Sequence, residues 1–548
     1  MIRWRPSRKP SVASIERDGC PIGARRRSTL LEPASIQCRG AKPDIRPNVF
    51  IPKNRMFPRI TLCIVCIAWG LVPTHTVDAN DRPNIVWIIG ENFSNDLACY
   101  GQSNVATPNL DRLADEGVRY MNAFATAPVC APSRTTFMTG MYATTIDGHN
   151  MRSHREDDYR LPHGVRPLTH RLKDAGYFTA NITHLDQVRV GTGKLDLNFV
   201  NEGPLYETSQ WSDLPSRQPF YAQINLPEAE YDIYDRKSAE KPRVPWVGEE
   251  WHPQVATEDR VDPPPHYPDH PIVRQEWARY LNSVSGADVR VGQILDRLEQ
   301  DGLTENTIVI FFADNGRLTP RGIHWPFDVG LRVPLIVRDS KSRPFLLATE
   351  SPGAVFDRVI SLLDLTATTI AMAGIEVPPT MQSRVFAGEA ASSPRRYAFA
   401  ARDRIDETVV RMRSVHDERF HYVRNYTPGA GFSTLNRYKE KCFLIKPLMR
   451  EMFAAGKLSG PPAELMKPFP DEMLFDLRAD PHELRNLADS EDADIQRTLS
   501  ALRAALDTWM VESGDLGHIA EPPEVVAPFV DEMDAWFGTP EWAKKLVP

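Results

Sequence analysis

The sequence predicts an α/β protein built around a mostly parallel sheet that lies between helices. Three apolar runs support this prediction, at residues 85–90, 218–226 and 307–313. A run that is apolar at nearly every position is typical of a strand buried on both faces, as in a parallel sheet. Amphipathic helical patterns at residues 107–117 and 273–300 lie between these runs. The alternation favours helices packed against the sheet.

A change of pattern near residue 386 predicts a second, smaller α+β subdomain. An apolar helix expected at residues 359–373 closes the larger domain. Shorter strand patterns follow at residues 396–401, 408–414 and 419–424, and an amphipathic helix is expected at residues 493–509. We therefore predict a domain at residues 80–385 and an antiparallel subdomain at residues 386–548.

The N-terminal 79 residues differ from the rest of the chain. Residues 1–55 are rich in Arg and Pro, and we interpret them as an upstream mis-start or a disordered basic segment. Residues 56–79 combine a short basic start, an apolar run too short for a comfortable membrane span, and small residues near a cleavage site. This pattern predicts a signal peptide and a secreted or periplasmic protein with no stable membrane span. An uncleaved signal anchor is the alternative.

Charge and cysteine content exclude two classes of protein. The 65 Lys and Arg residues nearly balance the 72 Asp and Glu residues, so we expect no nucleic-acid partner. After signal cleavage only Cys99, Cys130 and Cys442 remain, too few for a disulfide framework. Whether Cys99 and Cys442 pair with each other or stay free is left open.

The most informative stretch surrounds Cys130. Pro132 suits the first turn of a helix, where a missing N–H has no consequence, and Gly140 is a natural helix end. Cys130 is therefore expected at a helix N-terminus, where free N–H groups and the helix dipole favour an anion. Arg134 lies four residues further along the same stretch.

Oxygen-bearing side chains follow two of the predicted buried strands. Glu91 and Asn92 come directly after the first strand, and Asp314 and Asn315 come directly after the third. Ligands in open α/β sheets bind beyond the carboxyl ends of the strands. Carboxylate and amide oxygens are ligands for hard cations, so the four residues are candidate metal ligands.

Together these features resemble the type I, formylglycine-dependent sulfatases, and most closely the subgroup that includes heparan N-sulfatase. The resemblance rests on Cys-x-Pro-x-Arg at residues 130–134, the "TPNLDRLADEGVRYMNAFA" stretch at 107–125 and the "DVGLRVPLIVR" stretch at 328–338. It covers roughly residues 82–515. It implies an alkaline-phosphatase-like fold and a sulfuric ester hydrolase that removes sulfate from a sulfated carbohydrate.

The resemblance also implies the cofactors and the catalytic residues. A maturation enzyme would oxidise Cys130 to formylglycine, whose hydrate attacks sulfur. One divalent cation, calcium, would bind between Glu91, Asn92, Asp314, Asn315 and the modified Cys130. The other catalytic residues implied are Arg134 and Lys194, which would neutralise the sulfuryl group, and His149 and His324, which would serve the anion or the leaving group.

Four positions depart from the family pattern: Asn92, Asp196, Glu230 and Ile323. Asn92 replaces an acidic ligand, and Asp196 stands where many members have His. Glu230, or Glu228, would replace a His near the leaving group if its pKa were raised. Ile323 replaces a sulfate-binding Lys, and the neighbouring His324 could take that role as an imidazolium or as a neutral donor.

Two other functions stay open at this point. One is a phosphoric-ester or phosphonate hydrolase on the same scaffold, and the other is a non-catalytic binder of sulfated glycans. The sequence does not identify the sugar, the linkage, or whether an O-sulfate or an N-sulfate is cleaved.

Overall fold

A computed structural model of the chain describes residues 82–544, apart from residues 155–156 and 231–254. All described residues belong to one unit, Thr74–Pro548. The predicted signal peptide at residues 56–79 and the segment 1–55 lie outside the described residues. Within the described part of the chain, no helix is both long enough and apolar enough to cross a membrane.

The larger of two sheets has nine strands, in the order β4-β3-β6-β1-β7-β8-β2-β9, with β5 paired to β3. Most neighbours are parallel, whereas β8 runs antiparallel to β7 and β2, and β4 runs antiparallel to β3. The strands are β1 Asn84–Gly90, β2 Val118–Phe124, β3 Phe178–Leu185, β4 Val188–Arg189, β5 Thr208–Gln210, β6 Phe220–Leu226, β7 Thr307–Ala313, β8 Arg332–Arg338 and β9 Val355–Ser361. This confirms the predicted mostly parallel sheet.

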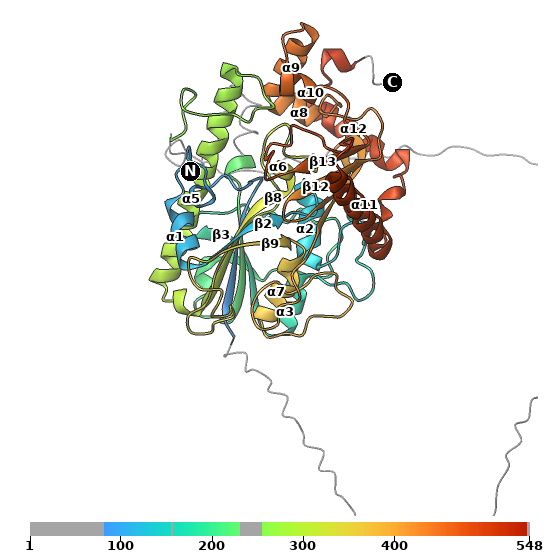
Figure 1. The fold of residues 1–548 in the computed structure, drawn as a ribbon. Coiled ribbons are helices and arrows are strands. Elements are labelled where there is room, and N and C mark those ends of the chain that lie inside the picture. Colours follow the sequence, from blue (N-terminus) through green and yellow to red (C-terminus); the bar gives the residue numbers. More distant parts are fainter. Residues whose placement is uncertain (1–81, 155–156, 231–254, 545–548) are drawn as a thin grey trace, which may run out of the picture. The chain divides into compact units, whose positions relative to one another are not determined.

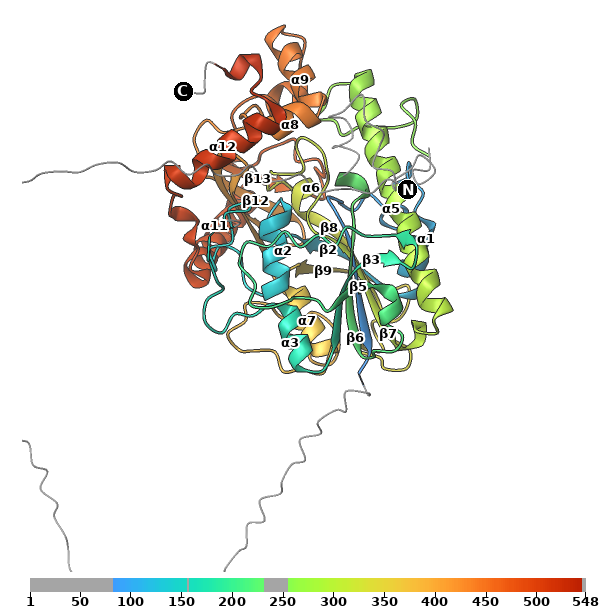
Figure 2. The ribbon, with the colours of Figure 1, turned by 180° about the vertical axis from the view of Figure 1, so that it is seen from behind.

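Helices cover both faces of this sheet (Figures 1 and 2). Trp87 of β1 shows how tightly one face packs, because its ring meets Phe137, Tyr221 and Phe312 edge-on. On one side lie α1 Pro108–Glu116 and α5 Pro271–Gln300; on the other lie α2 Cys130–Thr139, α3 Leu168–Asp174 and α7 Asp364–Met372; the short α6 Asp328–Leu331 precedes β8.

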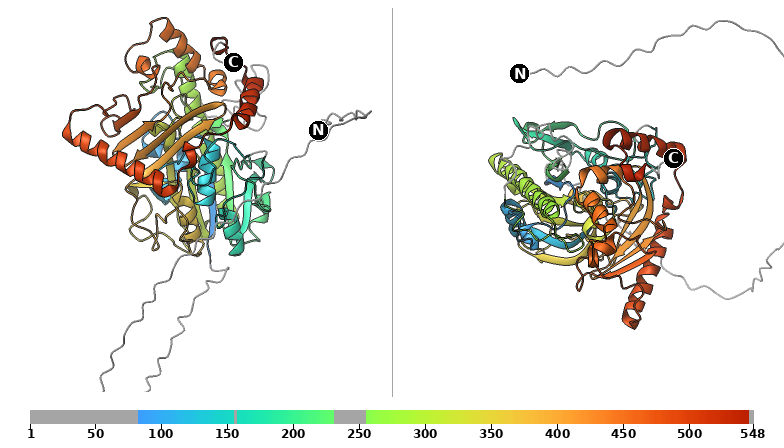
Figure 3. Two further views of the ribbon diagram at one scale, coloured as in Figure 1. Left: turned by 90° about the vertical axis from the view of Figure 1, so that its right-hand side faces the viewer. Right: turned by 90° about the horizontal axis from the view of Figure 1, so that it is seen from above.

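The second sheet is antiparallel, in the order β10-β11-β12-β13. The long helix α11 Ala493–Ser513 packs on it through Leu499, Leu502 and Leu506 (Figure 3). The remaining elements are β10 Ala398–Ile405, β11 Thr408–His416, β12 Phe420–Asn425, β13 Glu472–Asp476, α8 Arg437–Cys442, α9 Ile445–Ala454, α10 Gly460–Leu465 and α12 Pro523–Phe537. The predicted antiparallel α+β part is confirmed, while the boundary at residue 385 stays a prediction.

Short 3-10 turns complete the described elements. They are η2 Ala98–Tyr100, η3 Trp211–Asp213, η5 Thr304–Asn306, η6 Leu516–His518 and η7 Glu541–Ala543. Cys99 and Cys130 carry free thiols, so the pairing of Cys99 with Cys442 that the sequence left open is not formed.

The predicted helix at residues 359–373 is wrong in its first part. Residues Val355–Ser361 form β9, which pairs in parallel with β2, and the helix α7 begins only at Asp364. A uniformly apolar run has no period that separates strand from helix, and here the β-branched pair Val359 and Ile360 is buried in the sheet.

Candidate active site

The register of the central strands places two predicted metal ligands side by side. Gly90 at the end of β1 pairs with Leu226 of β6 and with Ala313 of β7. The Asp314 N–H donates to the Gly90 carbonyl at 3.1 Å. Glu91 and Asp314 therefore leave the sheet at the same level, on adjacent strands.

Asn92 and Asn315 lie beside Glu91 and Asp314 and complete the group. Asn92 has a left-handed backbone, φ 62°, which Asn adopts more readily than most residues. Its N–H donates to Asp314 Oδ1 at 3.1 Å, and Asn315 Nδ2 donates to Asn92 Oδ1 at 2.9 Å. Glu91, Asn92, Asp314 and Asn315 are each at most 1% exposed. The structure thus brings all four predicted ligands into one buried cluster.

Cys130 lies at the edge of this cluster. It is the first residue of α2, Pro132 falls in the first turn, and the helix ends at Gly140 in a left-handed conformation. The Cys130 Sγ is 4.0 Å from Asn92 Oδ1. Burial, reinforced by Asp314, raises the pKa of the Cys130 thiol well above its usual value. The predicted helix start at Cys130 is confirmed.

Arg134 follows Cys130 by one helical turn and holds the strand ends together. Its Nε donates to Asp314 Oδ2 at 2.9 Å and its Nη1 donates to Asn225 Oδ1 at 2.7 Å. The side chain is 1% exposed. Burial acts to lower the pKa of Arg134, but Asp314 and Glu91 outweigh it and raise the pKa. The charged guanidinium therefore links Asp314 to Asn225 inside the cluster.

Lys194 connects the cluster to Glu230. Its Nζ donates to Glu91 Oε2 at 2.9 Å and to Glu230 Oε2 at 2.6 Å. Burial alone would raise the pKa of Glu230, but the Lys194 charge lowers it. Glu228 is fully buried and pairs with Arg290 at 3.0 Å. Glu230 therefore does not meet the condition of a raised pKa, whereas Glu228, whose pKa burial raises, is paired with Arg290.

The cluster fits a bound divalent cation. Glu91 Oε1 and Asn315 Oδ1 are buried without a hydrogen-bond partner among the described residues. Three carboxylates, of Glu91, Asp314 and Glu230, face the two cations Arg134 and Lys194, which leaves one net negative charge. Burial, with the neighbouring Glu230, raises the pKa of Glu91 well above its usual value, the direction expected for a carboxylate without enough countercharge.

The candidate metal-ligand set combines carboxylates with neutral amides. In the described ranges no group of three or more His, Cys, Asp and Glu side chains is placed to hold a metal ion. Two of the four oxygen donors here are amides, so the site carries fewer charges than an all-acidic one. Oxygen donors of this kind suit calcium or magnesium rather than zinc.

Asp196 has a partner of its own. Arg152 Nε donates to Asp196 Oδ1 at 3.0 Å. Burial acts to raise the pKa of Asp196, but Arg152 and Lys194 lower it. The position that holds His in many family members is thus occupied here by an ionised carboxylate that orients Arg152.

Cys130 opens onto a pocket that the C-terminal part of the chain completes. Ile323 and His324 lie on its wall, and the Lys439 ammonium donates to the Ile323 carbonyl. Burial, with the charges of Lys439 and Arg402, lowers the pKa of His324 well below its usual value. This favours the neutral-donor alternative for His324. The lining residues are Asn92, Val129, Cys130, Met151, Arg152, Glu230, Ile323, His324, Asp406, Tyr438, Met533, Trp536 and Phe537.

The comparison with known families identifies this arrangement. The sulfatase family profile matches residues 83–375. The chain belongs to the sulfatase family. An ulvan-active sulfatase of Formosa agariphila is 32% identical over 474 residues, 80% of this chain and 77% of that protein. Human N-sulphoglucosamine sulphohydrolase is 26% identical over 486 residues, 79% of this chain and 91% of that protein. This sulfatase is therefore an enzyme that hydrolyses sulfate esters.

Solved structures share the fold of this sulfatase. A 2-O GAG sulfatase superposes with a TM-score of 0.54 at 17% identity, over 81% of this chain and 96% of that one. The phosphonate monoester hydrolase of Agrobacterium radiobacter superposes with a TM-score of 0.53, also at 17% identity, over 79% and 96%. The alkaline-phosphatase-like fold expected from the sequence is confirmed, and the fold by itself does not separate sulfur from phosphorus chemistry.

His149 is buried but lies apart from the described residues that line the pocket around Cys130. It is 5% exposed, and its Nε2 lies 3.4 Å from Asn150 Nδ2. It is not among the described residues that line the pocket around Cys130. Its catalytic role stays a prediction.

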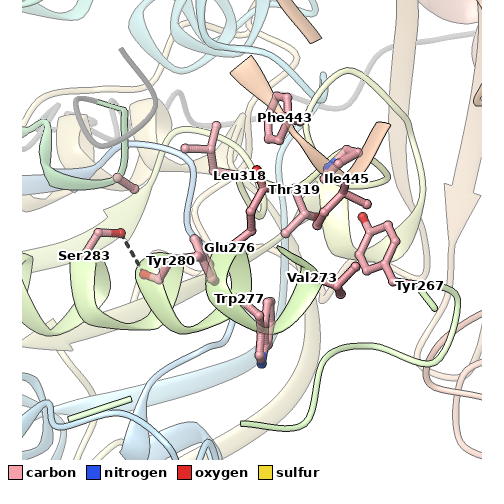
Figure 4. Close-up of a pocket in the computed structure, with 12 residues that line it drawn as sticks. Tyr267, Val273, Glu276, Trp277, Tyr280, Ser283, Leu318, Thr319, Phe443 and Ile445 are labelled. Carbon is pink, nitrogen blue, oxygen red and sulfur yellow. Dashed lines mark hydrogen bonds between the residues drawn. The ribbon is translucent and has the colours of Figure 1, made fainter. Parts of the chain in front are cut away.

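A second pocket, between α5 and the loop after Asn315, is not part of the active site (Figure 4). Its polar groups have partners of their own: Glu276 accepts from the Leu444 N–H at 2.7 Å, and the Tyr280 hydroxyl donates to Asp96. None of the predicted catalytic residues lines it.

Two kinds of site residue were not predicted from the sequence. Asn225 belongs to the end of the buried strand β6 and could have been found by the same rule that found Asp314. Tyr438, Trp536 and Phe537 come from the last quarter of the chain, where no local pattern distinguishes a pocket residue from a core residue.

Proposed function

We propose that this sulfatase removes sulfate from a sulfated carbohydrate, with formylglycine derived from Cys130 as the nucleophile and calcium as the cation. The observation that carries the proposal is the buried cluster in which Cys130 at a helix N-terminus meets Glu91, Asn92, Asp314 and Asn315. When formed, formylglycine would supply a hydrated aldehyde as the nucleophile of this chemistry. Calcium bound by these four residues supplies positive charge for the sulfuryl oxygens.

The chain's own residues prepare the site for that chemistry. Arg134 fixes Asp314 and Asn225, so the strand ends keep their spacing while substrate binds. Lys194 places a second positive charge between Glu91 and Glu230, next to the same cluster. Preorganised charges of this kind stabilise a transition state because they need no reorientation during the reaction.

His324 is the proposed neutral hydrogen-bond donor to the sulfuryl group or to the leaving oxygen or nitrogen. It lines the pocket with Cys130, and its lowered pKa keeps the imidazole neutral, so that its ring N–H can donate a hydrogen bond but does not transfer a proton. The backbone N–H of His324 donates to the Pro128 carbonyl at 2.7 Å, which ties it to the loop before Cys130. His149 is a second candidate donor to the leaving group. It is buried, and it lies two residues after Asp147 in the chain.

The names of the relatives support a sulfated carbohydrate substrate. One is called ulvan-active and the other acts on N-sulphoglucosamine, so both O-sulfated and N-sulfated sugars belong in a substrate panel. We further propose that the enzyme is secreted or periplasmic, after cleavage of the predicted signal peptide, and that a formylglycine-generating enzyme is its maturation partner.

Two measurements test the proposal. The tryptic peptide that contains Cys130, isolated from cells with a maturation enzyme, should show the mass change of a thiol replaced by an aldehyde. The purified protein should release sulfate from ulvan oligosaccharides or from glucosamine N-sulfate, and should lose activity after exhaustive chelation. An unmodified Cys130 in an active enzyme contradicts the formylglycine proposal. Cleavage of a phosphonate monoester in preference to every sulfate supports the first alternative; binding without any turnover supports the second.

A further inference from the structure

A row of aromatic rings leads from the catalytic pocket to the surface. The His324 ring lies 5.7 Å from the Tyr438 ring, centre to centre, and Tyr438 lies 5.7 Å from Phe537. Phe537 in turn lies 6.2 Å from Trp536. All four residues line the pocket into which Cys130 opens, and Trp536 is 52% exposed.

The outer half of this row belongs to α12, which is fixed at both ends. Before the helix, Arg404 of β10 donates to Glu521 at 3.0 Å. After it, Arg437 of α8 donates to Thr539 at 2.8 Å, and α12 packs against α8 (Figure 2). Both arginines are buried. The aromatic row is therefore a preorganised wall, and a ligand that meets it loses little entropy in ordering it.

Arg404 also connects α12 to the segment that precedes Arg152. Arg404 also donates to the Met151 carbonyl at 3.2 Å, and its guanidinium lies 3.9 Å from the centre of the Phe529 ring of α12. Met151 precedes Arg152, whose side chain lines the pocket with Asp406. The lining thus has two chemically different parts: a row of aromatic rings, and the charged residues Arg152 and Asp406, which are of the kind that can exchange hydrogen bonds with hydroxyls.

This asymmetry fits a pyranose ring. One face of such a ring presents C–H bonds, which pack against the electron-rich face of an aromatic side chain, while its rim presents hydroxyls. We propose that Trp536, supported by Phe537, is the substrate-binding residue that stacks the sugar carrying the scissile sulfate. The assignment rests on the proposed function, since it names the part of the substrate that this sulfatase holds outside the reaction centre.

Steady-state kinetics of Trp536→Ala and Trp536→Phe test the assignment. The substrate is whichever of ulvan oligosaccharides and glucosamine N-sulfate the wild type hydrolyses faster. We expect KM to rise about tenfold in Trp536→Ala with a smaller change in kcat, and Trp536→Phe to recover most of the loss because it keeps a ring. Phe453→Ala on α9 removes another exposed aromatic ring and is the matched control, with unchanged kinetics.

Product inhibition separates stacking from a structural effect. The desulfated sugar should inhibit the wild type and Trp536→Phe, and should inhibit Trp536→Ala about tenfold less. Equal KM and equal inhibition in folded Trp536→Ala and wild type overturn the stacking assignment while leaving the proposed function intact. A wild type that carries formylglycine and hydrolyses 4-nitrophenyl sulfate, but no sulfated sugar, overturns both.

Discussion

The active site of this sulfatase has two parts that are built differently. The residues at the sheet edge, Glu91, Asp314 and Arg134, are almost fully buried and linked by direct hydrogen bonds and ion pairs. The aromatic wall of the pocket comes from later segments and is linked by ring contacts between Tyr438, Phe537 and Trp536. Register between strands fixes the first part, whereas the second depends on how α8 and α12 dock.

Because the two parts are held together differently, they should respond differently to substitution. A charge network in a buried site tolerates little displacement, because an unpaired buried charge is costly. A wall of ring contacts tolerates changes of ring size, because packing energy is spread over many weak contacts. Substitutions at the sheet edge should therefore change the chemical step, and substitutions at the wall should change the choice of substrate.

The largest effect is expected at Cys130. Cys130→Ala removes the side chain from which the nucleophile is proposed to form, and kcat should fall by more than about 10⁴-fold with the fold retained. Sulfate release and circular dichroism measure the two quantities. Cys99→Ala, at another free thiol, is the control and should keep full activity. Residual activity within about tenfold of wild type would show that Cys130 is not the source of the nucleophile.

Asp314→Asn should have the next largest effect. The carboxylate accepts from Arg134 and from the Asn92 N–H, and it is a proposed calcium ligand. We expect kcat/KM to fall about 10³-fold. Thermal stabilisation by added calcium, which is about 2.7 kcal/mol at 100 times the Kd, should also be lost.

The exposed Asp357 provides a comparison for that variant. Asp357→Asn changes the same charge without touching the cluster, so activity and calcium response should match the wild type. If Asp314→Asn kept its calcium-dependent melting shift, the cation would have to bind elsewhere.

The stability of the contact between the two sheets should depend on pH. His416 of β11 stacks on Phe124 of β2, so it joins the two sheets. Burial, with His421 nearby, lowers its pKa from 6.5 to about 3. Below pH 6.5 the unfolded chain binds a proton that the folded chain does not, so stability from this group is complete above pH 6.5 and falls as the pH drops toward 3.

The slope measures the contribution of His416. The free energy of unfolding should fall by about 1.4 kcal/mol per pH unit from this residue, and His416→Gln should lose that part of the slope. Urea unfolding between pH 7 and pH 5 gives the slopes. His163→Gln, at an exposed His, should leave the slope unchanged. Equal slopes in His416→Gln and wild type would contradict the assignment.

The smallest effect concerns the amide at Asn92. Asn92→Asp restores a second charge beside Glu91 and keeps the acceptor oxygen for Asn315 Nδ2. Asp also tolerates the left-handed backbone at this position. We expect the calcium Kd to decrease about tenfold, because affinity rises with the number of charged ligands. Titration calorimetry measures this, and an unchanged or weaker Kd would show that Asn92 does not ligate the cation.

Much of the fold and the reaction centre could be predicted from the sequence because the signals are local. Buried parallel strands are apolar throughout, and the residues directly after them lie at one edge, which placed Glu91 and Asp314 correctly. Strand β9 was mistaken for helix because an apolar run has no period. The partners of Arg134, and the wall residues Trp536 and Phe537, depend on contacts between distant segments that no local pattern encodes.

The burial of Cys130 sets an order of events during synthesis. The thiol is 4% exposed, and Asp314, whose carbonyl accepts from Ser133 in the same helix, is made 184 residues later. The proposed modifying enzyme would therefore reach Cys130 more easily before the chain folds than afterwards. The proposed maturation therefore competes with folding, and a slower-folding variant would be modified more completely than a faster-folding one.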